Sequence, residues 1–483
     1  MHAAAVAESG DGNDKILMIA AVDLGSTNLK AALFRMDGRR LAEASFPLPY
    51  LLHTNGRSEL DPTAVEDCFF EVLGSLISNA AVRWEDVRRV ALTSQAQTFC
   101  LCDETGRVIS PFFGWEDTRA VEEASLLQRS LGAEFHRESG WPKVGPGLMV
   151  AKILWLRNNS DWSESHQIVS LPSFLAMRLG GPHVTDRNLS AMSGLYSLTN
   201  SSWSLPALEA LRIHEHQLGK LVDPGQTICC TGSTRLGASA SDFGIVMAGN
   251  DHTAGALGCG CHQGRSILTL GTAGVIYRQA GGMPGPFPEG GLWGPFPSGG
   301  YYELLCLNHA CSALDWADKF LSGTVDSQRF AGVAAGAEFR EDSPLFYPSQ
   351  WGTSAAWLGE GNINELAFAV FEGIAFALRN MANGMLADGE IVVLGGGSRL
   401  DFWVQLMADT FQMPVFRSKR DGLDGAAKLA GCKIPDDGAG DSVRHFPPNR
   451  ALAGRIDQRF ARWNSPNPAG AGAKSGFVGK GSR

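Results

Sequence analysis

Two short glycine turns have the residue types that hold phosphate groups. Gly25-Ser26-Thr27 follows Asp23 at the end of an apolar segment, and Gly271-Thr272 lies in a second apolar segment, Ser266 to Tyr277. Backbone N–H groups that converge in such a turn bind phosphate oxygens, and a nearby carboxylate can hold hydrated Mg²⁺. One turn of this kind also arises from ordinary turn chemistry. The recurrence therefore carries the prediction that two turns hold one polyphosphate.

Asp251 is the candidate for acid–base chemistry. It lies in Gly249-Asn250-Asp251-His252 and is followed by small residues that permit a close approach. A carboxylate at a helix start can accept the proton of a substrate hydroxyl that attacks a γ-phosphate. The alternative is that Asp251 only caps the following helix.

A third glycine-rich turn, Gly395-Gly396-Gly397-Ser398, follows an apolar strand-like segment and precedes Phe402 to Phe411, which has helical spacing. Backbone without side chains can approach a flat ligand such as a nucleotide. Glycines at a strand-to-helix turn are also ordinary packing devices. Both interpretations stay open at this point.

The surrounding pattern predicts the elements that position these residues. Apolar runs and turn residues predict strands, and apolar residues at helical spacing predict helices. The expected strands are 16–23, 29–34, a third after Asp37-Gly38, 87–93, two within 98–109, two within 266–277, and 391–394; the expected helices begin at 62, 117, 149, 364 and 402. Residues 140–244 allow only short helices to be assigned, and the Gly/Pro-rich residues 281–300 predict a surface loop.

The strand–turn–strand pattern of the N-terminal region recurs in 266–277, which predicts an α/β protein built from two related halves. We expect a disordered leader over residues 1–15, an N-terminal domain over 16–245, a C-terminal domain over 246–463, and a flexible Gly/Ala/Pro/Ser-rich tail over 464–483.

Composition excludes several classes of protein. The chain has 483 residues, enough for about two to four domains. Its 50 acidic and 41 basic residues give a net charge of −9 without a long basic block, which argues against nucleic acid as a partner. No apolar run approaches the roughly 20 residues of a membrane span. The leader lacks a signal-peptide pattern, so we expect a cytoplasmic protein, and the 10 cysteines show no zinc-binding spacing.

Taken in order, these features resemble the FGGY family of carbohydrate kinases, members of the actin-like ATPase superfamily, over residues 16–463. The matching positions are Asp23-Leu24-Gly25-Ser26-Thr27 with Lys30, Ser94-Gln95, Trp115-x-Asp117-x-Arg119, Lys152 with Trp155, Thr185-Asp186, Asp251, Gly271-Thr272, Glu372-Gly373-Ile374, and Gly395-Gly396-Gly397-Ser398 with Trp403, Gln405 and Asp409. The resemblance implies two actin-like (ribonuclease H-like) α/β domains with an interdomain catalytic cleft that closes around both substrates.

The resemblance also implies the activity and its residues. ATP would phosphorylate a hydroxyl of a small sugar or polyol, with a pentulose such as xylulose or ribulose as the expected acceptor and Mg²⁺ as the cofactor. Asp251 would be the base and Asp23 would organise Mg²⁺. The nucleotide would contact Gly25, Ser26, Thr27, Lys30, Gly271, Thr272, Gly396, Gly397 and Ser398. The sugar would contact Gln95, Trp115, Asp117, Arg119 and Asp251. A homodimer is among the assemblies that we consider.

The sequence departs from the family at two places. Glycerol kinases carry Arg-Glu after the glutamine that matches Gln95, whereas Ala96-Gln97 stands here, which disfavours glycerol. Xylulokinase-like members commonly have Gln-Met-His-Gly, which is not matched either. The second-half loop also differs, with Trp351-Gly352-Thr353-Ser354 and Gly359-Glu360-Gly361. Two alternatives remain open: an actin-like ATPase that signals to a protein partner, and a sugar-binding relative with weak catalysis.

Overall fold

The computed structural model describes residues 17–54, 56–230, 233–236, 243–283, 291–338, 340–350, 352–353, 356–382, 385–386, 389–435 and 444–465. They divide into two compact units. The first unit comprises the described parts of Met1–Gln263, Tyr277–Leu304 and Lys419–Ser442, and the second those of Gly264–Ile276, Leu305–Ser418 and Val443–Arg483. The expected leader, residues 1–15, and all but the first two residues of the expected tail lie outside the described residues.

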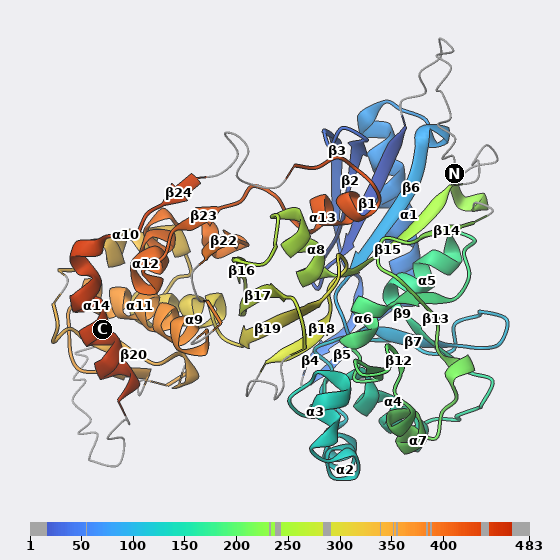
Figure 1. Cartoon of the computed structure of the whole chain (residues 1–483), viewed down its shortest axis with the longest axis horizontal. Coiled ribbons are helices and arrows are strands. Elements are labelled where there is room, and N and C mark those ends of the chain that lie inside the picture. Colours follow the sequence, from blue (N-terminus) through green and yellow to red (C-terminus); the bar gives the residue numbers. More distant parts are fainter. Residues whose placement is uncertain are drawn as a thin grey trace, which may run out of the picture. The chain divides into compact units, whose positions relative to one another are not determined.

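A six-stranded sheet forms the centre of the first unit (Figure 1). Its order is β14-β15-β6-β1-β2-β3, where β1 is Met18–Leu24, β2 Asn28–Arg35, β3 Arg40–Pro47, β6 Val87–Ser94, β14 Thr227–Cys229 and β15 Gly244–Asn250. Strands β1 to β3 form the predicted antiparallel meander, and β6 lies parallel to both β1 and β15. The expected strands in residues 16–93 are therefore confirmed.

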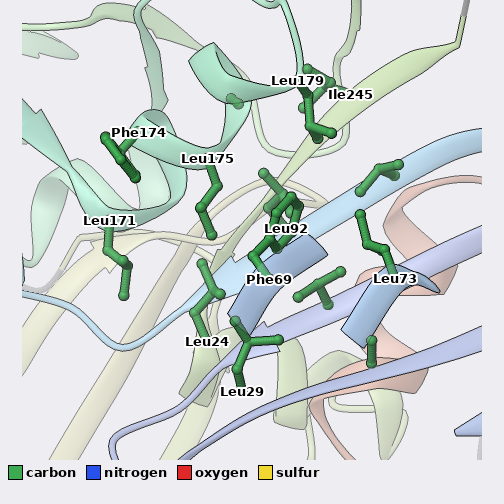
Figure 2. Close-up of a cluster of buried hydrophobic side chains, with 14 of the residues drawn as sticks. Leu24, Leu29, Phe69, Leu73, Leu92, Leu171, Phe174, Leu175, Leu179 and Ile245 are labelled. Atoms are coloured by element: carbon green, nitrogen blue, oxygen red, sulfur yellow. The ribbon is translucent and has the colours of Figure 1, made fainter. Parts of the chain in front are cut away.

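Helices cover both faces of this sheet. On one face, α1 (Pro62–Ala80) and α5 (Leu171–Arg178) bury apolar side chains against the strands, as Figure 2 shows for Phe69 and Leu175 beside Leu92. The predicted start of α1 is confirmed, because the Asp61 carboxylate accepts a hydrogen bond from the N–H of Thr63. On the other face, α13 (Gly422–Leu429) packs small side chains such as Ala426 against β1.

Helix α13 also packs unusually closely against α8 (Asp251–Gly258), the helix that begins with the candidate base. The contact is made by glycines: a Cβ on Gly425 would collide with the carbonyl oxygen of Ala254, and one on Gly258 with that of Asp421. Side chains larger than hydrogen therefore do not fit at this crossing without moving α8.

We expect Gly425→Ala to lower the free energy of unfolding by about 1–3 kcal/mol, because the added methyl overpacks a backbone-to-backbone contact. Urea unfolding measures the change. Gly332→Ala is the matched control, since Gly332 lies inside helix α10 (Ser327–Ala335) with open space around it. Alanine should stabilise that helix slightly. Equal effects of the two substitutions would show that the α8–α13 crossing is not tight.

The rest of the first unit is less regular. A five-stranded sheet has the order β4-β5-β8-β7-β9, formed by Tyr50–Thr54, Arg57–Leu60, Phe112–Phe113, Phe99–Cys102 and Gln167–Ser170. Its helices and remaining strands are short: α2 Val121–Leu131, α3 Glu134–Ser139, α4 Met149–Asn159, α6 Arg187–Ala191, α7 Leu205–Leu211, β10 Val184–Asp186, β11 Tyr196–Ser197, β12 Ser202–Trp203 and β13 Lys220–Val222. Of the two strands expected in 98–109, the first forms as β7, and the second is reduced to a single bridge at Val108.

The prediction of a surface loop over 281–300 is wrong for residues 292–295, which form a strand. Residues 284–290 lie outside the described residues, but Leu292–Pro295 forms strand β18, paired with β19 (Tyr301–Leu307). Trp293 is buried beside Tyr196 and Leu198, and its N–H donates to the carbonyl of Gly140. The glycines and prolines around this short apolar segment conceal it in the composition.

In the second unit, β16 (Arg265–Leu270), β22 (Glu390–Leu394), β23 (Val415–Arg417) and β24 (Arg444–Phe446) are successive neighbours in one sheet. The helices of this unit are α9 Cys311–Ser322, α10, α11 Ile363–Met381, α12 Asp401–Phe411 and α14 Ala453–Asn464. The predicted strand pair of 266–277 forms as β16 and β17 (Gly274–Ala280), and the predicted helices from 364 and 402 form as α11 and α12. No helix in the described ranges could cross a membrane.

Candidate functional site

The strand order of the first unit brings three candidate residues to one edge of its sheet. Strands β15, β6 and β1 are parallel neighbours, with Ser94 opposite both Leu24 and Asn250. Gly25, Gln95 and Asp251 are the residues that follow these three strand ends. Ligands of open α/β sheets bind beyond the carboxyl ends of parallel strands. The fold therefore places the first phosphate turn, one sugar-side candidate and the candidate base together.

Hydrogen bonds from neighbouring residues hold the first turn, Gly25–Thr27, in place. Lys30, on the next strand, is the register partner of Asp23 and is exposed. The carbonyl of Ser26 accepts a hydrogen bond from the hydroxyl of Tyr50 at 2.7 Å, and that of Thr27 accepts one from the N–H of Leu48 at 2.9 Å. Both hydrogen bonds are accepted by backbone carbonyls, and the side chain of Thr27 is exposed.

Asp23 lies in an environment that disfavours its charge. Burial, followed by the nearby carboxylates of Asp251 and Asp421, raises the pKa of Asp23 to about 7, while Lys30 opposes the rise. Its Oδ1 atom is buried and, among the described residues, has no hydrogen-bond partner. Asp23 is thus a carboxylate with an unsatisfied oxygen close to two further acidic residues, a chemistry that suits contact with a cation.

The described residues contain no group of three or more His, Cys, Asp or Glu side chains arranged to ligate a metal directly. Mg²⁺ does not require such a cluster, because it keeps several waters and commonly takes only one or two carboxylates together with substrate phosphates.

Asp251 is not the cap of its helix. Asn250 holds the N-cap position, and its side chain accepts the hydrogen bond from the N–H of Thr253. The carboxylate of Asp251 is partly exposed in the first helical turn, where it accepts a hydrogen bond from the N–H of His252 at 2.9 Å. The capping alternative is therefore wrong, and the Asp251 side chain is available for another role.

A buried polar network holds the chain just before Asp251. Asn188 Oδ1 accepts hydrogen bonds from the N–H and the side-chain amide of Asn250, at 3.0 and 2.7 Å. The carboxylate of Asp186 accepts a hydrogen bond from the N–H of Gly249, and the hydroxyl of Thr93 donates one to the carbonyl of Gly249 at 3.0 Å. Gly249 has φ +73°, and a Cβ there would lie 2.7 Å from Asn188 Oδ1. Asp186, Gly249 and Asn250 of this network lie in motifs that stood out in the sequence, whereas Asn188 and Thr93 do not.

In the second unit, the other two turns also share one sheet edge. Strands β16 and β22 are parallel neighbours, and Gly271 and Gly395 follow their ends. The Thr272 side chain is exposed, while its carbonyl accepts the N–H of Ala310. Figure 1 shows β16 and β22 side by side within this unit.

The three residues of the glycine-rich turn differ in surroundings. Gly396 has open space where a side chain would stand. Gly397 lies against Trp403, and Ser398 is buried with its hydroxyl bonded to the carbonyl of Gly395 at 2.7 Å. Gly396 is therefore free to approach a ligand, whereas Gly397 and Ser398 shape the turn.

On the sugar side, Gln95 is the most suggestive residue. Its side chain is only 4% exposed, and neither amide atom has a hydrogen-bond partner among the described residues. Its N–H donates to the carbonyl of Leu24 at 2.8 Å, which fixes it beside the first turn. An unsatisfied buried amide is costly, so a polar ligand or water at this position would relieve a real penalty.

Asp117 and Arg119 satisfy each other. Asp117 is fully buried, and its carboxylate accepts hydrogen bonds from Arg119 Nε at 2.8 Å and Nη2 at 2.6 Å and from the N–H of Ser58 at 2.9 Å. Burial opposes the charge, but the Arg119 hydrogen bonds outweigh it and hold the pKa of Asp117 below its usual value. Arg119 also pairs with Glu59, which belongs to none of the sequence motifs. Trp115, two residues before this pair, is 43% exposed.

We expect Arg119→Met to lower the free energy of unfolding by about 3–5 kcal/mol, because it leaves the Asp117 carboxylate buried without its cation. Denaturant unfolding at several pH values measures this. The folded pKa of Asp117 is depressed, so the pair stabilises at neutral pH and its contribution is lost as pH falls. The deficit of the variant should therefore shrink in acid. Arg107→Met, which removes an exposed arginine that pairs with Asp103, is the control and should change stability little.

Comparison with known proteins finds relatives of the whole chain in sequence and in fold. The chain is 25% identical to the xylulose kinase of Escherichia coli over 446 residues, 86% of this chain and 89% of that kinase. It is 26% identical to the glycerol kinase of Citrifermentans bemidjiense over 448 residues, 86% of this chain and 89% of that kinase. In fold it resembles a xylulose kinase structure from Brucella ovis, with a TM-score of 0.83, 23% identity and coverage of 94% of this chain and 99% of that one.

Family models cover most of the chain. The model described as "FGGY family of carbohydrate kinases, N-terminal domain" matches residues 18–258, and that described as "FGGY family of carbohydrate kinases, C-terminal domain" matches residues 269–433. The structural neighbours support two actin-like domains. The chain belongs to the FGGY family of carbohydrate kinases, phosphotransferases that use ATP and an alcohol acceptor.

Proposed function

We propose that this protein transfers the γ-phosphoryl group of ATP to a hydroxyl of a pentulose, with Asp251 as the general base. The observation that carries the proposal is the meeting of the first phosphate turn, Gln95 and Asp251 at the ends of three adjacent parallel strands. In this proposal residues 16–245 contribute the sugar side and the first phosphate turn and residues 246–463 contribute the nucleotide side, while the base, Asp251, lies in the first compact unit.

The transfer needs one proton acceptor. As the acceptor oxygen bonds to the γ-phosphorus, its hydroxyl proton passes to a carboxylate oxygen of Asp251 and the bond from the γ-phosphorus to the ADP oxygen breaks. The network of Asn188 and Asp186 keeps the backbone before Asp251 in place. Holding the base rigidly supports catalysis, because positioning supplies much of the acceleration in phosphoryl transfer.

Asp23 is the residue that we propose holds hydrated Mg²⁺. Its raised pKa and its unsatisfied buried oxygen support this role. When bound, Mg²⁺ supplies charge neutralisation for the phosphates and the developing negative charge. We propose that the phosphate oxygens contact the turns at Gly25–Thr27 and Gly271-Thr272, with Lys30 near the first, and that Gly396-Gly397-Ser398 lies at the adenosine.

The pentulose assignment rests on relatives and on one departure. Four relatives that are 22 to 25% identical to this chain are named xylulose kinases. Ala96-Gln97 replaces the Arg-Glu pair of glycerol kinases, which argues against glycerol. We propose that the sugar contacts the amide of Gln95 and the indole face of Trp115. We propose that the buried Asp117–Arg119 pair supports the loop of Trp115 from within the protein. ATP use fits a cytoplasmic location.

The test is ADP release from Mg²⁺ and ATP with a panel of pentuloses, hexuloses, heptuloses, aldonates and polyols. We expect one pentulose to raise ADP release far above the rate without acceptor. Stimulation by another acceptor class would replace the pentulose assignment. ATP hydrolysis that no acceptor stimulates would favour an actin-like signalling ATPase, and binding without turnover a weakly catalytic sugar-binding relative.

A further inference from the structure

Lys152 is a buried lysine that forms no ion pair with any described residue. Its side chain is 1% exposed, and its Nζ atom donates hydrogen bonds to two backbone carbonyls, those of Gln97 at 2.8 Å and Gly114 at 2.6 Å. It also lies over the ring of Phe99. A buried ammonium group is costly to desolvate, so its two carbonyl partners are the feature that needs explanation.

Gln97 returns the contact to the same helix. Its Oε1 accepts a hydrogen bond from the N–H of Met149 at 2.6 Å, in the first turn of α4, and its Nε2 donates to the carbonyl of Met192. The N–H of Met149 and the side chain of Lys152 both belong to the first turn of α4. Gln97 has φ +67°, a conformation that side chains other than glycine rarely adopt. Helix α4 and the 95–98 loop are therefore joined by two hydrogen bonds, from Lys152 Nζ to the Gln97 carbonyl and from the Met149 N–H to Gln97 Oε1; we call this pair of bonds the clasp.

Because Lys152 also donates to the carbonyl of Gly114, the clasp connects the two loops that carry sugar-side candidates. Gln97 is two residues from Gln95, whose amide is buried and unsatisfied, and Gly114 directly precedes the exposed Trp115. A cavity of about 30 Å³, lined in part by Gln95, Gln97 and Met149, lies beside the clasp. That volume has room for water.

We propose that Lys152 is a positioning residue for the acceptor, which sets the spacing between the loops of Gln95 and Trp115 through the carbonyls of Gln97 and Gly114. This inference rests on the proposed function, because it assumes that these two loops face the sugar. A side chain kept only to fill space would not need an amino group that donates two hydrogen bonds, since a methionine has a similar length and a lower desolvation cost. The role of Lys152 lies in its hydrogen bonds, which predicts an effect confined to the acceptor.

The test compares Lys152→Met with Lys220→Met, a substitution of an exposed lysine on β13. We expect Lys152→Met to raise the KM of the acceptor by about tenfold or more while the KM of ATP and kcat change by less than about threefold. Lys220→Met should change none of them. Gln97→Gly, which keeps the left-handed backbone but removes the side-chain half of the clasp, should also raise the acceptor KM.

In the double variant the two effects should be clearly less than additive, because both substitutions open the same clasp. An unchanged acceptor KM in Lys152→Met would overturn the inference, as would a parallel loss of ATP affinity, kcat and thermal stability, which marks a purely structural lysine. If Lys152→Met does not fold, an unchanged acceptor KM in Gln97→Gly overturns it. A wild-type protein that turns over no acceptor overturns the proposed function as well, so the two failures are distinguishable.

Discussion

Asp251→Asn should lower kcat for acceptor phosphorylation by about 10² to 10⁴, the usual size of a general-base contribution. Asparagine has nearly the same shape but cannot accept the proton of the attacking hydroxyl. The cap and the network around Asn250 do not use the Asp251 side chain, so the fold and nucleotide binding should persist. Single-turnover kinetics with saturating ATP and acceptor measure the chemical step, and calorimetry measures ATP affinity.

Asp161→Asn is the matched control, because Asp161 is an exposed aspartate of the same unit. It should leave kcat unchanged. Turnover of Asp251→Asn within a few-fold of the wild type would remove Asp251 from the proton-transfer step. A large loss of both ATP affinity and stability would instead assign Asp251 a structural role.

Asp23→Asn should weaken divalent-cation binding and lower kcat/KM for Mg-ATP by about 10- to 100-fold, as loss of a residue that orients a bound metal commonly does. The substitution removes one negative charge from the group that Asp23 forms with Asp251 and Asp421. Mn²⁺ binding in the presence of ADP, followed by electron paramagnetic resonance, measures the cation directly and does not depend on turnover.

The same variant makes a pH prediction. The folded-state pKa of Asp23 is raised to about 7, above its unfolded value, so the wild type without cation loses stability as pH rises from about 4 through 7. Asp23→Asn removes that loss and should show a flatter stability profile over this window. Asp37→Asn, at an exposed pair with Arg35, is the control and should keep the wild-type profile. Identical profiles and identical Mn²⁺ affinity in Asp23→Asn and the wild type would contradict the assignment.

Local patterns predicted the framework of the molecule well. The β1–β3 meander, β6, β16, β22 and the long helices α1 and α11 have strong apolar periodicity and clear turn or cap residues, which act over short distances in the chain. The strand β18 was missed because its apolar run is short and is surrounded by glycine and proline, whose composition is typical of loops.

The candidate site could be predicted only in part. The turns, Gln95 and Asp251 have local motifs, but the partners that give them their chemistry come from distant parts of the chain. Burial and Asp251 raise the pKa of Asp23, and Asp421 adds to the rise from almost 400 residues away. Asn188 orders the backbone before Asp251. The pairing of Arg119 with Glu59, 60 residues away in the chain, is likewise evident only from the structure. Such tertiary contacts leave no periodic signal in a single sequence.

The most direct test of the central claim is to follow the γ-phosphoryl group itself. ATP labelled at that group would be incubated with the protein, Mg²⁺ and xylulose or ribulose, and the products separated by mass spectrometry, with Asp251→Asn in parallel. We predict that the label appears in a sugar monophosphate in amounts equal to the ADP formed, and that the variant forms almost none. Label released only as inorganic phosphate, at the same rate with and without sugar, would contradict the kinase function.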